Sequence, residues 1–414
     1  MSTPSGEVLA KVYGSDKGRA SERFSYISDM FEKTFGEGDP EFFTAPGRTE
    51  IIGNHTDHNG GKVIAGCITL DSIGAAKKNG TRFMKVSNEG YGYFEIDLDH
   101  PENSPKEQGT VSVLAGMIEY CNKNNIIVDG FSTYTTTEVI GASGVSSSAS
   151  FEMLIMAMIN FLFNDGNMSF ASYAKAGQYA ENVYWNKASG LMDQMACAVG
   201  GPIELDFRND PVYEKIPFGF EEYGYSMVIV NTGKGHADLS PDYSAVPSEM
   251  KAVAKALGHE RLCDGTLEEL LDNYTEVKEK VQNDRAVLRA IHFYTENDRV
   301  IQMSEAMEKK DVKAILNILN KGGESSYEQL QNPYSLGDVK TQGMCLALSL
   351  TKLFMARIND GACRIHGGGF AGVIQAVVPT DKLDDYVDYI SGFFGRDNVY
   401  PMNIRATGAA HLEK

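Results

Sequence analysis

Three short segments rich in glycine and small polar residues restrict the fold of this chain most strongly. They are residues 45–57 (APGRTEIIGNHTD), residues 141–149 (GASGVSSSA) and residues 365–372 (IHGGGFAG). The middle segment runs into an apolar stretch at residues 151–163, which predicts a long buried helix. The backbone N–H groups and the positive end of such a helix can hold phosphate oxygens. The sequence therefore predicts a phosphate-binding loop at the start of this helix.

Length and composition limit the number of domains and the kinds of partner that we expect for this chain. With 414 residues and 42% hydrophobic content, the chain exceeds what one core usually supports, so we expect two domains, residues 1–215 and 216–414. A formal net charge of −18 disfavours binding to nucleic acid and to anionic membranes. Six cysteines without a C-x-x-C pair argue against a zinc site and a disulfide framework. No segment predicts a signal peptide or a membrane span, so we expect a cytoplasmic protein, and nothing indicates an obligate protein partner.

Hydrophobic periodicity predicts a mixed α+β chain. Strands are expected at residues 51–52, 63–68, 83–86, 131–137 and 225–230, and a strand interrupted by glycines at residues 361–378. Helices are expected at residues 24–35, 110–123, 151–163, 170–180, 248–256, 267–293 and 300–319.

Two acidic residues follow the serine-containing segment. Glu181 comes after a helical pattern, and Asp193 follows Ser189 and Gly190, which favour the start of a helix and would place the carboxylate at its loop end. Phosphoryl transfer needs one group to orient or deprotonate the attacking hydroxyl and another to hold the metal that neutralises the triphosphate. The two acids meet both needs. The hydroxyls of Ser146, Ser147 and Ser148 are suited to phosphate or magnesium, and they are also candidates for capping the helix.

The first segment gathers polar side chains beside apolar strand residues. Arg48, Glu50, Asn54, His55 and Asp57 all lie within it, and they suit a pocket that offers donors and acceptors to sugar hydroxyls.

These three ordered segments together resemble the galacto-, homoserine-, mevalonate- and phosphomevalonate-kinase superfamily, and within it most closely the galactokinase family. Further similar stretches lie at residues 189–194 and 289–300, and more loosely at residues 236–243. The resemblance implies an α+β fold with an S5-like N-terminal lobe, a ferredoxin-like C-terminal lobe and an active site in the cleft between them. It implies transfer of phosphate from ATP, with Mg²⁺, to the anomeric C1 hydroxyl of galactose.

The resemblance also implies roles for particular residues. Asp193 would accept or orient the proton of the anomeric hydroxyl, and Arg48 would stabilise negative charge beside it. Glu181 with Ser147 or Ser148 would engage magnesium. The sugar site would comprise Asn54, His55, Asp57, Gly190 and Tyr243, and the ATP phosphates would lie against Gly141, Ser143, Gly144, Ser146, Ser147, Ser148 and Gly368.

One departure from the family leaves the sugar open. Galactokinases usually have glutamate at the position of Asn54, where it binds the C6 hydroxyl. Asparagine there removes a negative charge, so galacturonate would meet less repulsion, and L-arabinose, which lacks C6, is a further alternative. An Asn54→Glu change would then shift preference toward galactose. A sensor that binds sugar and ATP without transferring phosphate and a kinase for mevalonate or homoserine are the remaining alternatives.

Overall fold

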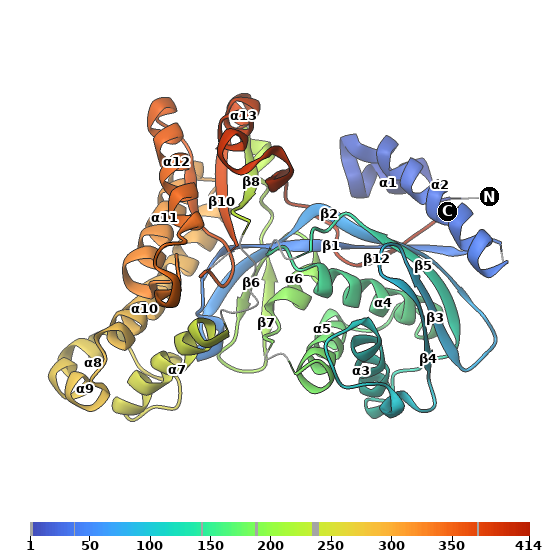
Figure 1. Cartoon of the computed structure of the whole chain (residues 1–414), viewed down its shortest axis with the longest axis horizontal. Helices are drawn as coiled ribbons and strands as arrows, with labels where there is room; N and C mark the ends of the chain where they lie inside the picture. Colours follow the sequence, from blue (N-terminus) through green and yellow to red (C-terminus); the bar gives the residue numbers. More distant parts are fainter. Residues whose placement is uncertain (1–2, 37, 142–143, 187–188, 234–239, 371) are drawn as a thin grey trace.

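The computed structural model describes the chain except for residues 1–2, 37, 142–143, 187–188, 234–239 and 371. Within these described residues, two β-sheets covered by helices form two lobes (Figure 1). The first sheet has the strand order β12-β1-β2-β5-β3-β4, with β6 pairing to β2 and β7 to β6. The second has the order β11-β8-β10-β9. The prediction of a two-lobed α+β fold is confirmed.

The first lobe is formed mostly by the N-terminal half of the chain. Its elements are α1 (Gly6–Tyr13), α2 (Lys17–Phe35), β1 (Glu41–Ile52), β2 (Lys62–Lys78), β3 (Phe83–Asn88), β4 (Gly92–Asp97), α3 (Thr110–Lys123), β5 (Phe131–Thr137), α4 (Ser147–Phe163), α5 (Phe170–Tyr179), α6 (Met192–Val199), β6 (Pro202–Asp206) and β7 (Val212–Lys215). A π-helical turn (Ala180–Tyr184) continues α5.

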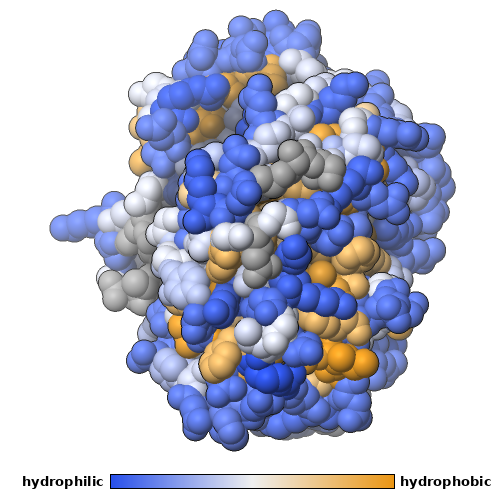
Figure 2. All heavy atoms as spheres, turned by 90° about the vertical axis from the view of Figure 1, so that its right-hand side faces the viewer, coloured by the Kyte–Doolittle hydropathy of each residue, from blue (hydrophilic) through white to orange (hydrophobic). Residues whose placement is uncertain are grey.

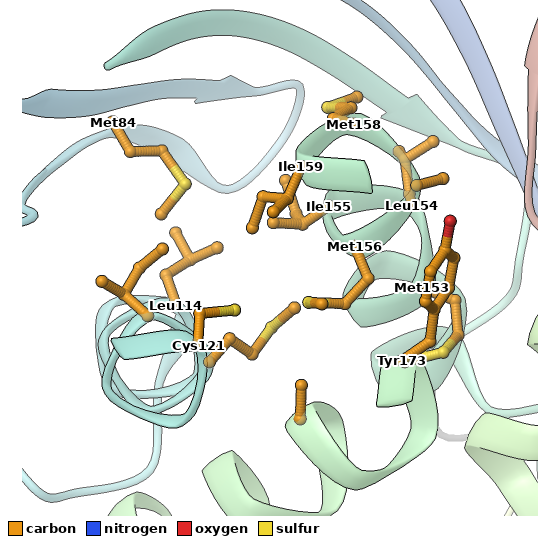
Figure 3. Packing of buried hydrophobic residues seen from close by; sticks show 14 of the residues in the cluster. Met84, Leu114, Cys121, Met153, Leu154, Ile155, Met156, Met158, Ile159 and Tyr173 are labelled. Atoms are coloured by element: carbon orange, nitrogen blue, oxygen red, sulfur yellow. The ribbon is translucent and has the colours of Figure 1, made fainter. Parts of the chain in front are cut away.

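Helices cover both faces of the first sheet. Because neighbouring strand residues point to opposite faces, Phe42 packs with Phe24 of α2, whereas Phe43 belongs to the cluster around α4. The helix α4 is buried along most of its length and lies at the centre of that cluster. Figure 3 shows side chains of α4 pointing toward Leu114 and Cys121 of α3. This packing fixes the start of α4, where the serine-containing segment lies.

The second lobe contains α7 (Ser240–Ala256), α8 (Leu267–Asp272), α9 (Tyr274–Val281), α10 (Asp284–Glu308), α11 (Val312–Ser325), α12 (Gly343–Ile358) and α13 (Leu383–Phe394), with β8 (Tyr225–Asn231), β9 (Ala362–Ile365), β10 (Val373–Pro379) and β11 (Val399–Met402). One face of its sheet packs against α12 and α13. The other face shares a buried cluster with α10, α11 and the first-lobe strands β1 and β2. The two lobes therefore share a core.

The chain returns to the first lobe at its C-terminal end. Strand β12 (Ala410–Leu412) pairs antiparallel with β1, next to the N-terminal helices. The change from one sheet to the other falls between β7 and β8, near residue 215. The division into domains 1–215 and 216–414 stays a prediction, and β12 is a segment of the second range that belongs to the first sheet.

The structure confirms some predicted elements and corrects others. The helix at residues 110–123 and the strand at residues 131–137 have the expected bounds. The helical pattern expected at residues 267–293 is confirmed, but it is divided among α8, α9 and the start of α10. Gln282 adopts a left-handed conformation after α9, with φ 49° and ψ 33°, and thereby ends that helix. The helix expected at residues 300–319 is likewise divided between α10 and α11.

The face of the molecule drawn in Figure 2 is mostly hydrophilic, with apolar patches between polar side chains. Among the described residues, no helix combines the length and the apolar character that crossing a membrane requires. The described cysteines are free, and all except Cys345 are buried.

Candidate active site

A cavity of about 900 Å³ gathers the three glycine-containing segments at one place. Its walls come from the end of β1 and the loop after it, from the start of α4, from the π-helical turn and α6, and from residues of the second lobe. Most of the predicted site residues line it: Arg48, Asn54, His55, Asp57, Gly144, Ser146, Ser147, Ser148, Glu181, Gly190, Asp193, Tyr243 and Gly368. Gly141 is exposed and is not among the lining residues, and Ser143 lies outside the described residues.

An ion pair between Arg48 and Asp193 occupies the centre of this cavity. The Arg48 Nε and Nη2 atoms lie 2.8 and 2.7 Å from Asp193 Oδ1, and Nη1 donates to the carbonyl oxygen of Gly144. The Arg48 backbone N–H also donates to Val145 O at 3.1 Å, which ties β1 to the serine-containing segment. Burial opposes the charge of Arg48, but Asp193 outweighs burial and raises the pKa of the guanidinium. Arg48 thus stays charged beside the carboxylate.

Ser146 is bonded to the same carboxylate. Its Oγ donates to Asp193 Oδ2 at 2.5 Å, and its backbone is left-handed, with φ 57° and ψ 60°. Ser146 occupies the N-cap position of α4, yet its side chain makes no capping hydrogen bond. The expectation that this hydroxyl caps the helix is therefore wrong, because the left-handed backbone turns it toward Asp193. As predicted, Asp193 lies in the first turn of α6.

The start of α4 offers a place for phosphate groups. The first backbone N–H groups of a helix have no partner within the helix, and the helix dipole attracts anions there. Gly144 (φ +73°) leads into this turn, and a Cβ on it would lie 2.9 Å from Val373 Cγ2. Only glycine therefore brings the segment this close to the second lobe.

Glu181 lies beside the start of α4 and suits a magnesium ion. Ser148 Oγ donates to Glu181 Oε1 at 3.3 Å, and Gln194 Nε2 lies 3.3 Å from Oε2 of the same carboxylate. Gln194 also donates to the buried Glu152 at 3.0 Å. No group of three or more His, Cys, Asp or Glu side chains suited to a metal occurs among the residues described. A nucleotide-bound Mg²⁺ needs only one or two protein ligands besides phosphate and water, so Glu181 and a serine hydroxyl fit it.

The loop after β1 holds the glycine-rich loop of the second lobe. His55 Nε2 lies 2.8 Å from Gly368 O, and Asn54 Nδ2 donates to Gly367 O at 2.6 Å. Burial, reinforced by the neighbouring His58, lowers the pKa of His55 to about 3, so this imidazole is neutral at neutral pH.

Tyr243 closes this end of the cavity. Its ring centroid lies 5.1 Å from that of His55, and a Cβ on Gly368 would lie 2.3 Å from Tyr243 Cε2. A Cβ on Gly190 would lie 3.0 Å from Asp57 Oδ2, which brings these two predicted sugar-site residues together. The predicted sugar site is therefore one contiguous wall.

Several residues behind this wall had no role in the sequence prediction. Glu296 Oε1 accepts from the backbone N–H of Gly53 at 3.1 Å, and His292 Nε2 lies 2.9 Å from Asn54 O. Both belong to the stretch 289–300 that contributes to the family resemblance, and they position the loop after β1. Asn332, which belongs to none of the segments, donates to Asn54 Oδ1 at 2.8 Å. Its part in the site depends on folding contacts that no local pattern indicates.

Comparisons with known proteins agree with this geometry. A family model described as "Galactokinase galactose-binding signature" matches residues 29–78, and one described as "GHMP kinases N terminal domain" matches residues 112–201. The galactokinase of Streptococcus mutans is 30% identical over 371 residues, which cover 86% of this chain and 90% of that protein. The chain belongs to the galactokinase family.

Other members of the galactokinase family are similarly close. The galactokinase of Streptococcus thermophilus is 29% identical over 376 residues, covering 87% of this chain and 91% of its own length. The crystal structure of Lactococcus lactis galactokinase complexed with galactose superimposes with a TM-score of 0.79 at 26% identity, covering 94% of this chain and 99% of that one. A mevalonate kinase structure with a TM-score of 0.61 and 16% identity shares the fold. The predicted superfamily fold is confirmed.

Proposed function

We propose that this member of the galactokinase family transfers the γ-phosphoryl group of ATP to the C1 hydroxyl of galactose, giving galactose 1-phosphate and ADP. The contact of Arg48 and Ser146 with the Asp193 carboxylate, directly beside the start of α4, carries this proposal. It places a carboxylate for the acceptor hydroxyl next to a site for phosphate. Membership of the family and the match to the galactose-binding signature support galactose as the sugar.

Asp193 receives or orients the proton of the attacking hydroxyl. Arg48 and Ser146 hold its two carboxylate oxygens in place, so little reorganisation is needed when the sugar binds. Arg48 also places a fixed positive charge where negative charge develops on the attacking oxygen and the transferred group.

The start of α4 binds the phosphates of ATP. Ser146, Ser147, Ser148 and Gly144 supply backbone and hydroxyl groups there, while Gly368 of the second lobe faces the cavity from the other side. A bound Mg²⁺ neutralises charge on the phosphates, and Glu181 with Ser147 or Ser148 would hold it. Asn54, His55, Asp57, Gly190 and Tyr243 form the sugar wall.

Release of ADP by the purified protein tests this function. The protein is supplied with ATP and Mg²⁺ and, separately, with galactose, galacturonate, L-arabinose, N-acetylgalactosamine and glucose. We expect turnover with galactose well above that with every other sugar. Turnover only with another sugar would contradict the assigned substrate, and no turnover with any sugar would contradict catalysis and favour a sensor.

A further inference from the structure

Glu50 is a glutamate that lines the cavity and that the proposed mechanism does not use. It follows Arg48 by two residues on β1, and the pairing of β1 with β2 is regular from Arg48 to Glu50. Alternate strand residues point to the same face, and two residues span about 7 Å. Both side chains line the cavity, and Glu50 is only 4% exposed. The backbone of Glu50 therefore lies about 7 Å beyond that of Arg48 on the same face of the strand.

The partners of Glu50 leave it able to accept a further hydrogen bond. Its Oε1 accepts from Asn54 Nδ2 at 3.1 Å and from Arg364 Nη2 at 3.2 Å. Its Oε2 has one long contact, 3.4 Å from the same Asn54 nitrogen. An ionised carboxylate offers about four acceptor positions, so at least one on Oε2 remains for a ligand.

Asn54, by contrast, uses both of its amide hydrogens in contacts with the protein. Its amide hydrogens go to Glu50 and to Gly367 O, and its Oδ1 accepts from Asn332. Asn54 is 1% exposed. Donating to a sugar oxygen through this amide would break one of these contacts, and Oδ1 keeps only one further, uncharged acceptor position. The free position on an ionised Glu50 is the stronger acceptor, because its hydrogen bonds are charge-assisted.

We infer that Glu50, and not Asn54, is the residue that binds the sugar at the end remote from C1, by accepting a hydrogen bond from the hydroxyl on C4 or C6. Asn54 is a positioning residue that aligns the Glu50 carboxylate and the glycine-rich loop. This inference rests on the proposed function. It also corrects the expectation that Asn54 eases the binding of galacturonate, because Glu50 restores a carboxylate within hydrogen-bond distance of Asn54, and like charges repel strongly in a buried site.

The test compares wild type with Glu50→Gln, with Glu50→Asp and with the control Glu41→Gln, a glutamate of the same strand that binds His411 instead of lining the cavity. The value of kcat/KM is measured for galactose, 4-deoxygalactose, 6-deoxygalactose and galacturonate at about pH 8.5, because burial raises the pKa of Glu50 to about 7 and the carboxylate is ionised above that value. The melting temperature reports folding. Arg364 keeps Glu296 as a second partner at 3.6 Å, so we expect Glu50→Gln to fold.

For Glu50→Gln we expect kcat/KM for galactose to fall about 10- to 100-fold, mainly through KM, because a charge-assisted hydrogen bond becomes a neutral one. The preference for galactose over one of the two deoxy sugars should collapse, and relative activity with galacturonate should rise. Glu50→Asp keeps the charge and should still reject galacturonate. Its selectivity against galacturonate can be measured even if Glu50→Gln unfolds. Glu41→Gln should behave as wild type.

Suppose that the wild type phosphorylates galactose and that Glu50→Gln keeps the wild-type selectivity against both deoxy sugars and galacturonate. That result would overturn the role of Glu50 but not the proposed function. Failure of the wild type to phosphorylate galactose would instead overturn the proposed function. The two failures are therefore distinguishable.

Discussion

Among single residues, two carboxylates of the cavity have different surroundings and different proposed roles. Asp193 is held by Arg48 and Ser146 and has 30% of its side chain exposed, whereas Glu50 is nearly buried and held by Asn54 and Arg364. Burial raises the pKa of Glu50 to about 7, and Arg364 and Arg48 offset this only in part. The two acids therefore occupy different electrostatic environments within one cavity.

Replacing Asp193 tests the catalytic assignment. Asp193→Asn keeps the size of the side chain but removes the proton acceptor, so we expect kcat to fall about 10²- to 10⁴-fold. Binding of ADP should change little. It can be followed by the fluorescence of Trp185, which is the only tryptophan in the chain and lines the cavity. Asp206→Asn, outside the cavity lining, is the control, and an Asp193→Asn enzyme that keeps most of its turnover would remove Asp193 from this role.

Placing a glutamate at position 54 tests the Glu50–Asn54 pair. A second carboxylate would replace the amide that lies 3.1 Å from Glu50 Oε1, so Asn54→Glu alone should lower affinity for galactose and stability. This reverses the expectation from sequence that the change improves galactose preference. The double variant Glu50→Asn/Asn54→Glu, which exchanges the two side chains, should recover part of the loss. Steady-state kinetics and thermal unfolding of the three variants measure this coupling, and additive effects would contradict it.

At the scale of elements, the glycine-rich loop between β9 and β10 must approach Tyr243 closely. Gly368→Ala would place a methyl group 2.3 Å from Tyr243 Cε2, so the ring must move away from the sugar wall. We expect KM for galactose to rise several-fold with little change in melting temperature, because the exposed ring can rotate toward solvent. Gly392→Ala in α13, where a Cβ meets nothing within 4 Å, is the control. An unchanged KM would show that Tyr243 does not contact the sugar.

Local patterns predicted elements where the sequence itself carries their limits. The helix α3 and the strand β5 were predicted with their observed bounds, since polar or glycine residues flank clear periodic runs. The sequence does not predict the division of residues 267–308 into α8, α9 and α10, because only Asn273 and the pair Gln282 and Asn283 interrupt a long run of helix-forming residues.

The sequence predicts the residues of the candidate site that lie in motifs, but it does not predict contacts between distant parts of the chain. Arg48 and Ser146 lie in two of the three segments and Asp193 lies in the further stretch 189–194, and the structure brings these residues together. The contact of Asn332 with Asn54 joins residues 278 positions apart, and that of Arg364 with Ile51 of β1 joins residues 313 positions apart. No periodicity or spacing encodes such contacts, so Glu50 could be recognised as a pocket residue but not as the partner of Arg364.

At the scale of the whole molecule, Asp71 of β2 joins three distant parts of the chain. Its buried carboxylate binds Arg23 of α2 at 2.7 Å and Arg405, near the C-terminal end, at 2.7 Å, and Tyr13 donates to it as well. Burial alone would raise the pKa of Asp71, but the two arginines outweigh burial and hold it well below its usual value. A lowered pKa means that this stabilisation is present above about pH 4 and is lost as the pH falls further.

Asp71→Asn should therefore lower the free energy of unfolding by about 3–5 kcal/mol at pH 7, because it leaves Arg405 buried without its carboxylate. The difference from wild type should shrink below about pH 4. Urea unfolding at several pH values measures it, and Asp99→Asn, which touches only the exposed pair with Arg82, should hardly move the midpoint. A constant difference across the pH range would contradict the electrostatic origin.

The proposed function requires the Arg48–Asp193–Ser146 arrangement to direct phosphate to C1 of galactose. Phosphorus NMR of the product formed from ATP, Mg²⁺ and galactose tests it most directly. We expect one sugar phosphate whose phosphorus couples to the anomeric proton, and formation of the same product about 10²- to 10⁴-fold more slowly with Asp193→Asn. A phosphorus coupled to the C6 protons, or the absence of any sugar phosphate with the wild-type protein, would contradict it.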